Sequence, residues 1–181
     1  MRADARRNVE RVLKAAEELF ADEGLSVPVD MIAARAGVGV GTLYRHFPTK
    51  EALFTAIVVA HLESLSARAR DLAASEPGEA FFTFLREMGE MAARKRDLAD
   101  ILARAGLFTV ETCPVKQQLQ EQFETLLERA QAAGAVRPDV TGDDVTALLM
   151  GACLTGGEHG QPAADVMVSV ICDGLRADHR R

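Results

Sequence analysis

The chain has 181 residues, of which 48% are hydrophobic and 27% are charged, so it can form a sizeable folded core and a wholly disordered chain is excluded. The net charge is −6, but the charges are unevenly distributed: residues 1–50 hold eight Lys and Arg against seven Asp and Glu, whereas the remaining residues hold 13 Lys and Arg against 20 Asp and Glu. The N-terminal part is therefore compatible with binding nucleic acid. Because there is no run of about 18 uncharged apolar residues and no apolar leader, we expect a cytoplasmic protein without a membrane span.

Two helices are predicted at the N-terminus. A stripe of apolar residues three and four positions apart over residues 9–20 predicts an amphipathic helix that ends near Gly24. A second, short helix begins around Pro28, because proline is tolerated in a first helical turn. Gly37 stops this helix.

The remaining elements are also helical. A third helix is predicted from Val40 to His46, ended by Pro48, and a long fourth helix begins at Thr49–Glu51. Further helices are expected after Pro77, over residues 98–107, 115–133 and 163–177, and from a Thr141 cap through residue 154. The sequence therefore predicts an all-α fold of about nine helices and no sheet.

Residues 37–54, GVGVGTLYRHFPTKEALF, place a glycine-rich turn before the one dense aromatic and basic cluster of the chain. A dinucleotide-binding loop needs glycine at relative positions one, three and six after a strand. Gly37 and Gly39 fit that pattern, but the sixth position is Thr42 and a helix precedes the turn. The Gly-Lys-Ser/Thr of a nucleotide phosphate loop is also missing, so this interpretation is rejected.

A helix-turn-helix explains the same stretch better. Two helices that cross steeply need a small residue where they touch, and Ala33 supplies it. Gly37 can adopt the left-handed backbone of the turn. Leu43 and Phe47 lie one turn apart and are expected to point into the core. The opposite side of the second helix then faces outward, towards a duplex.

Seven residues are the candidate DNA-binding set. Thr42 can reach a base edge or a thymine methyl group, and Gly41 lets the helix approach the duplex closely. Tyr44, His46 and Lys50 are placed to hold phosphates. The full set is Val40, Gly41, Thr42, Tyr44, Arg45, His46 and Lys50.

The segments VDMIAARAGV (29–38) and GTLYRHFPTKEALF (41–54) resemble the DNA-binding head of the TetR family of bacterial transcriptional regulators, over roughly residues 6–60. The resemblance implies an all-helical homodimer that binds double-stranded DNA at a palindromic operator and is released from it by a small-molecule effector. It implies a helix-turn-helix domain at residues 1–50 and an effector-binding and dimerisation domain at residues 51–181. The expected function is a repressor with a largely hydrophobic effector.

The chain departs from the family pattern at two places. Gly39-Val40 stands where the family often has Ser-Lys, and Val27-Pro28 stands where it often has paired threonines. Both changes remove side chains suited to phosphate contacts, so we expect fewer ionic contacts per head and a shallower dependence of DNA affinity on salt. An N-terminal arm carrying Arg2, Arg6 and Arg7 is a candidate to compensate by entering the minor groove, or it is a solvated tail.

Candidate effector contacts are apolar positions on helices that the family wraps around its ligand. They are Phe81, Phe84, Met88, Met91, Leu102, Phe108, Phe123 and Leu126. Aromatic and methionine residues at helical spacing are also what an ordinary core contains, so roughly half of them are expected to line a cavity.

The last two helices are too apolar for the surface of a small monomer, and small residues within them allow close packing of a symmetric partner. The candidate homodimer interface comprises Leu148, Leu149, Ala152, Val166, Val170 and Ile171. A two-fold dimer also suits a palindromic DNA site, because each head reads one half of it.

Two other functions remain open. The alternative function is a thiol- or redox-responsive regulator on the same scaffold, because Cys113 lies in a predicted loop. Only Lys116 lies near Cys113 in sequence to lower the pKa of its thiol. An enzyme is disfavoured because the four histidines are dispersed and form no triad or paired-ligand motif. We therefore assign no catalytic residues, no metal site and no cofactor.

Overall fold

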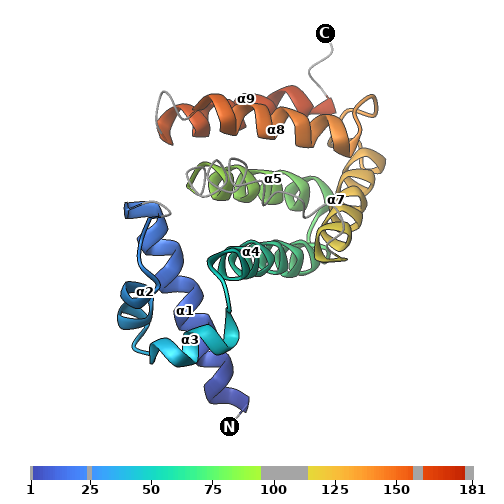
Figure 1. Ribbon diagram of the computed structural model, residues 1–181. Coiled ribbons are helices and arrows are strands. Elements are labelled where there is room, and N and C mark those ends of the chain that lie inside the picture. The colour runs from blue at the N-terminus through green and yellow to red at the C-terminus, as the bar shows by residue number, and fades with distance from the viewer. Residues whose placement is uncertain (1, 24–25, 95–113, 157–160, 178–181) are drawn as a thin grey trace. The chain divides into compact units, whose positions relative to one another are not determined.

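The computed structural model describes residues 2–23, 26–94, 114–156 and 161–177. Over these ranges the chain forms eight α-helices and no strand, with one isolated antiparallel bridge between Val136 and Arg176 (Figure 1). The all-α fold is thus confirmed. The helix expected over residues 98–107 lies outside the described residues.

The chain divides into two compact units, an N-terminal unit up to His61 and a C-terminal unit from Leu62 onward. The N-terminal unit contains the first part of the long helix α4 (Lys50–Leu72) together with α1 (Arg2–Glu23), α2 (Val29–Ala36) and α3 (Val40–His46). All four helices contribute to one apolar core, whose largest fully buried side chains are Phe20, Ile32, Leu43, Leu53 and Ile57. This core fixes α2 and α3 against α1 and the start of α4.

The turn between α2 and α3 depends on Gly37. This residue has φ 64°, in the left-handed region that glycine adopts without a steric penalty. The N–H of Gly37 donates to the carbonyl of Ala34 at 3.1 Å, and the N–H of Val38 donates to that of Ala33 at 3.0 Å. These two bonds satisfy the last carbonyls of α2 and redirect the chain into α3. The predicted bounds of both helices agree with the structure.

Helix α4 belongs to both units. Its residues Leu53, Phe54 and Ile57 are buried in the N-terminal core, whereas Ala69 and Leu72 are buried in the C-terminal core. By length and composition alone, α4 is the one helix among the described residues that is apolar enough to cross a membrane. Its apolar residues are divided between two protein cores, which accounts for that composition.

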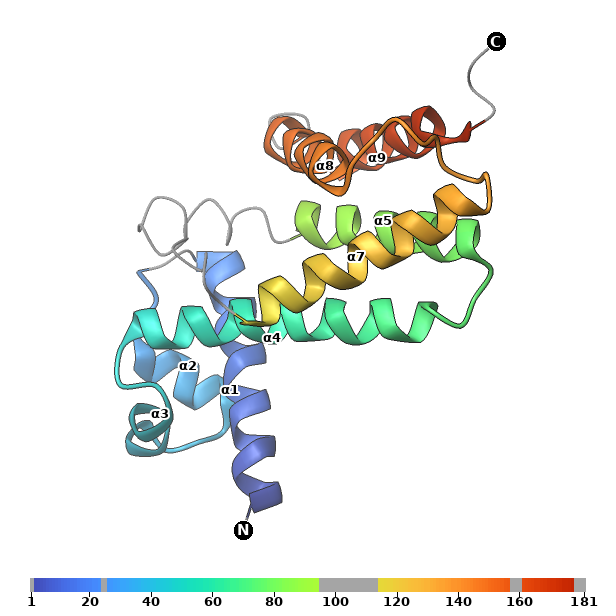
Figure 2. The ribbon, with the colours of Figure 1, turned by 90° about the vertical axis from the view of Figure 1, so that its right-hand side faces the viewer.

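The C-terminal unit packs the second part of α4 with α5 (Pro77–Arg94), α7 (Pro114–Ala132), α8 (Gly142–Gly156) and α9 (Gln161–Leu175). Helix α5 contacts α7, α8 and α9 and is the central element of this unit (Figure 2). Its aromatic residues form the middle of the core: Phe81 lies 5.9 Å and Phe84 6.2 Å from the ring of Phe123 on α7, between ring centroids.

Helix ends in the C-terminal unit are closed by local hydrogen bonds. Glu76 caps α5 by accepting the N–H groups of Gly78 and Glu79, at 3.0 and 2.7 Å. Thr141 and Asp144 cap α8 reciprocally, because each side chain accepts the backbone N–H of the other residue. The Thr141 cap predicted from the sequence is therefore confirmed.

Candidate functional site

Helix α3 has an inner and an outer side. Leu43 is 1% exposed and Phe47, directly after the helix, is 7% exposed, so both point into the core as predicted. Gly41, Tyr44 and His46 are exposed, and Tyr44 shows 45% of its surface. A Cβ atom added at Gly41 would meet nothing within 4 Å. The outer side of α3 thus presents an aromatic phenol, an imidazole and a flat stretch of backbone.

Arg45 folds back along α3. Its Nε donates to the carbonyl of Gly41 at 3.1 Å, and its Nη2 donates to the hydroxyl of Thr42 at 3.3 Å. The guanidinium and the Thr42 hydroxyl therefore form one polar group on the outer side of the helix. Both groups can donate hydrogen bonds to base edges or phosphates. Val40 is half-buried against the N-terminal core and offers only a part of its side chain.

Lys50 begins α4, so the last predicted DNA-binding residue lies at a helix N-terminus. Thr49 caps this helix by accepting the N–H of Ala52 at 3.1 Å. Next to it, the pKa of Glu51 lies below its ordinary value, because its carboxylate accepts its own backbone N–H and the Thr49 hydroxyl. Lys50 is half-buried and follows the last residue of α3 by four positions along the chain.

The arginines of the predicted N-terminal arm lie in a helix. Arg6 and Arg7 are part of α1, where Arg6 pairs with Glu10 at 3.2 Å and Arg7 pairs with Asp4. These partners lie four and three residues away, the spacings that bring side chains together on a helix. That charge pattern was the signal in the sequence for helix at this point. Arg6 and Arg7 are therefore helical and paired with carboxylates, and entry of this segment into the minor groove stays a prediction.

The predicted effector contacts divide into three groups. Phe81, Phe84, Phe123 and Leu126 are at most 4% exposed and pack in the core of the C-terminal unit. Met88 and Met91 are half-buried on α5. Leu102 and Phe108 lie outside the described residues. The structure thus brings the three aromatic rings together and places the two methionines further along α5.

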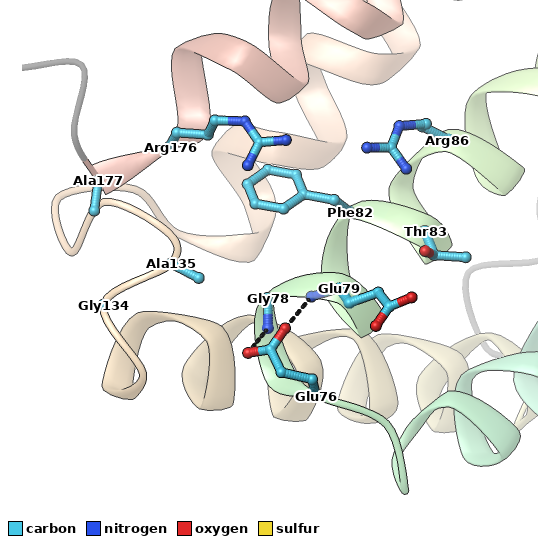
Figure 3. Close-up of a pocket in the computed structure, with 10 residues that line it drawn as sticks. All are labelled: Glu76, Gly78, Glu79, Phe82, Thr83, Arg86, Gly134, Ala135, Arg176 and Ala177. Atoms are coloured by element: carbon cyan, nitrogen blue, oxygen red, sulfur yellow. Dashed lines mark hydrogen bonds between the residues drawn. The ribbon is translucent and has the colours of Figure 1, made fainter.

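A surface pocket of about 450 Å³ lies elsewhere in the C-terminal unit and is lined by none of the predicted effector contacts (Figure 3). Phe82 forms its apolar part, with the guanidinium of Arg176 4.5 Å from the ring centroid. Arg86, one turn along α5, also faces the pocket, and Glu76 and Glu79 lie at the beginning of that helix. Basic and acidic groups thus share this pocket, which is polar in character.

Helices α8 and α9 carry a row of exposed apolar residues. Leu148, Val166 and Val170 are 50%, 63% and 64% exposed, and Met150 adds to the row at 43%. The other predicted interface residues face inward: Leu149 and Ala152 are buried, and Ile171 packs partly against the core. Three of the six predicted residues are therefore available to a partner.

No group of three or more His, Cys, Asp or Glu side chains that could hold a metal ion occurs among the described residues. Cys172 is buried, and burial raises the pKa of its thiol above the ordinary value, which makes it a weak nucleophile. Cys113 lies outside the residues that the structure describes.

Comparison with known proteins identifies both units. Residues 12–57 match the family model described as "Bacterial regulatory proteins, tetR family". Residues 76–177 match the model described as "Transcriptional regulator SbtR-like, C-terminal domain". Curated HTH-type transcriptional regulators of Staphylococcus aureus are 44% identical over 54 residues, a segment that covers 29% of this chain and 29% of theirs.

Solved structures extend the similarity to the whole chain. A TetR regulator from Mycobacterium vanbaalenii is 45% identical with a TM-score of 0.76, over 97% of this chain and 98% of that one. The regulator SCO0520 from Streptomyces coelicolor is 34% identical with a TM-score of 0.76, over 93% and 98%. A gamma-butyrolactone receptor, 23% identical with a TM-score of 0.68 over 97% and 92%, shares the fold.

The buried Leu43 and Phe47, the turn at Gly37 and the matching family model together define the N-terminal unit as a helix-turn-helix DNA-binding domain of a transcriptional regulator. The second match covers more than half of the chain, and the Mycobacterium vanbaalenii structure is similar over nearly all of it. The chain belongs to the TetR family of transcriptional regulators.

Proposed function

We propose that this protein is a repressor that binds a palindromic operator as a homodimer and leaves it when a small molecule binds the C-terminal unit. The observation that carries this proposal is the outer side of α3. Leu43 and Phe47 anchor the helix from inside, and the half-buried Thr42 and the exposed Tyr44 and Arg45 would face the groove. Polar side chains on a helix of this kind read base edges and phosphates in the major groove.

The homodimer is supported by the exposed apolar row on α8 and α9. Leu148, Met150, Val166 and Val170 expose 43 to 64% of their surfaces, which is more apolar surface than these helices need for their own core. A symmetric partner would cover it with the same residues. Two heads would then address successive major grooves, about 34 Å apart on B-DNA. Leu149, Ala152 and Ile171 would support this face from beneath.

The effector is proposed to be small and largely hydrophobic. The core of the C-terminal unit is rich in aromatic and methionine side chains, including Phe81, Phe84 and Phe123, with the half-buried Met88 and Met91 alongside on α5. Such surroundings favour an apolar ligand. The fold neighbour named a gamma-butyrolactone receptor also makes a small-molecule ligand a reasonable proposal for this chain.

Regulation would run through α4, because this helix supplies apolar residues to both cores. A ligand that prefers one arrangement of the C-terminal unit by about 3 kcal/mol changes DNA affinity by roughly 150-fold. The ligand need not touch the DNA-binding surface. It needs only to bind more tightly to the arrangement in which the two heads no longer match adjacent grooves.

The test is operator binding. Labelled duplexes that tile the DNA flanking the gene are titrated with the full chain at low salt, with a scrambled duplex as control, and a bound fragment is then footprinted. We expect a protected inverted repeat, and weaker binding by Tyr44→Ala with an unchanged melting temperature. If no duplex binds more tightly than the scrambled one, the proposal fails. Mass spectrometry of a solvent extract of the purified protein tests for a retained apolar ligand.

A further inference from the structure

Basic and acidic residues lie in different halves of helix α1. Residues 2–14 hold five Lys and Arg against two Asp and Glu, whereas residues 15–23 hold four acidic residues and no basic one. The acidic half is used inside the N-terminal unit: Glu17 contacts His61 and Glu18 pairs with Arg35, both at 3.1 Å. The basic half has no comparable partners from α2, α3 or α4 among the described residues.

Two cations in the basic half have no carboxylate partner within the described part of the chain. Arg11 donates to the amide oxygen of Asn8, which is neutral and leaves the guanidinium charge uncompensated. Lys14 is exposed and makes no hydrogen bond or ion pair with described residues. Arg6 and Arg7, by contrast, are paired with Glu10 and Asp4. Arg6 and Arg7 thus balance the two carboxylates of residues 2–14, and Arg11 and Lys14 add uncompensated positive charge to this half of α1.

Arg11 lies beside the turn of the helix-turn-helix, and Lys14 follows it on α1. Arg11 and Lys14 are three residues apart and thus share a face of α1, with Arg7 one turn before them. A Cβ atom placed on Gly37 would lie 3.6 Å from Nη1 of Arg11, so the guanidinium reaches the turn that leads directly into α3. Figure 2 shows the turn between α2 and α3 passing beside the N-terminal half of α1.

The start of α3 supplies no cation of its own. Its N-cap is Gly39, which has no side chain to cap the helix, and the next two residues, Val40 and Gly41, are uncharged. A duplex that received α3 in its major groove would bring a phosphate strand along each side of the helix. On the side of the turn, the cations within reach come from α1, chiefly from Arg11.

We propose that Arg11 and Lys14 form a phosphate-binding stripe that holds the DNA backbone flanking the groove entered by α3. This inference rests on the proposed DNA-binding function and adds a second contacting element to it. The guanidinium of Arg11 suits bidentate contact with phosphate oxygens. Lys14, about one helical turn further along α1, adds a point charge for the same DNA strand. The stripe sets affinity and register and carries no sequence information. It also replaces the ionic contacts that Gly39 and Val40 cannot make.

The test measures how the dissociation constant of the full chain depends on salt, for the operator duplex and for a scrambled duplex. The variant is Arg11→Gln/Lys14→Gln. The matched control is Arg6→Gln on the same helix, whose side chain is already paired with Glu10. Arg11→Lys/Lys14→Arg keeps both charges. Melting temperatures establish that each variant is folded.

For the double Gln variant we expect the slope of log K against log salt to become shallower by about 1.8, since each phosphate contact contributes about 0.9. Affinity at 0.1 M salt should fall at least about tenfold for both duplexes, which leaves the ratio between them unchanged. Arg6→Gln and the charge-preserving variant should keep the slope of the unmodified protein.

An unchanged slope in the double Gln variant overturns the proposal, and so does an equal change in Arg6→Gln, which would indicate diffuse attraction by the whole helix. A fall in the melting temperature of the double Gln variant that is large enough to account for its lost affinity overturns the proposal as well. Failure of the unmodified protein to bind any duplex refutes the proposed function itself. If the unmodified protein binds the operator and the double Gln substitution leaves the salt slope unchanged, only the phosphate-binding stripe is refuted.

Discussion

The carboxylate Oε2 of Glu17 on α1 lies 3.1 Å from the imidazole Nε2 of His61 on α4, although 44 residues separate the two along the chain. Both side chains are partly buried, with 34% and 21% of their surfaces exposed. Near them, Phe20 of α1 stacks on Phe54 of α4 with a centroid distance of 4.4 Å. A polar and an aromatic contact thus fix the first part of α4 on α1, before the helix enters the C-terminal unit.

Replacing His61 should loosen this attachment. We expect His61→Ala to lower the free energy of unfolding by about 1 kcal/mol, the size of one hydrogen bond to a partly exposed charged group. His61→Gln should lose less, because the amide keeps an N–H donor. Urea unfolding followed by circular dichroism measures both changes. His46→Ala, at an exposed position on α3, serves as control, and an equal loss there would contradict the assigned role of the pair.

Two glycines that are close in sequence should respond in opposite ways to the same substitution. Gly37 has φ 64°, so Gly37→Ala should cost about 1 to 2 kcal/mol of stability through backbone strain. Gly41 lies inside α3 with nothing within 4 Å of an added Cβ atom, so Gly41→Ala should raise stability by up to about 1 kcal/mol.

Operator affinity separates the two roles further. Gly41→Ala adds a methyl group to the side of α3 that is proposed to face the duplex, and we expect weaker binding in spite of the more stable fold. Thermal melts and anisotropy titrations of the same preparations measure both quantities. A stabilised variant with unchanged affinity would show that Gly41 is not at the contact surface.

The helix-turn-helix was predictable because its signals are local. Gly37 and Pro48 mark the ends of α2 and α3 through backbone geometry alone, and the spacing of Leu43 and Phe47 indicates their burial. The Glu17–His61 contact was not predictable, since it depends on how two distant helices pack. The folding of Arg45 onto Thr42 and the carbonyl of Gly41 likewise depends on a side-chain rotamer that no spacing pattern encodes.

Periodicity was less informative in the C-terminal unit. Leu148 and Leu149 are neighbours on α8, yet Leu148 is 50% exposed and Leu149 only 2%. Because α8 and α9 are apolar on most of their surfaces, the sequence does not distinguish residues of the core from residues available to a partner. The same applies to Phe81 and Phe84, whose helical spacing fits both a closed core and the wall of a ligand cavity.

The exposed row on α8 and α9 predicts the effect of a charge on self-association. Val170 is 64% exposed in the single chain, so Val170→Glu should leave the fold intact and place two like charges across a symmetric interface. We expect sedimentation at micromolar concentration to change from a dimer to a species of 19.5 kDa. Gln117→Glu on the exposed side of α7 should remain dimeric. A monomeric unmodified protein would refute the proposed interface.

The cap of α8 predicts a loss of stability in acid. The carboxylate of Asp144 accepts the Thr141 hydroxyl at 2.7 Å and the Thr141 N–H at 2.9 Å, and these bonds, the hydroxyl first, hold its pKa below the ordinary value. A carboxyl group whose pKa is lowered in the folded state stabilises the fold at any pH above its unfolded value, here near 4, and loses that contribution as the pH falls through the lower folded value. Urea unfolding of the unmodified protein, Thr141→Val, Asp144→Asn and the double variant measures the coupling free energy between the two side chains. This coupling should therefore be constant from pH 7 to 5 and decline below about pH 4. A coupling that persists undiminished at pH 2, or that is already absent at pH 7, would show that this carboxylate does not stabilise the start of α8.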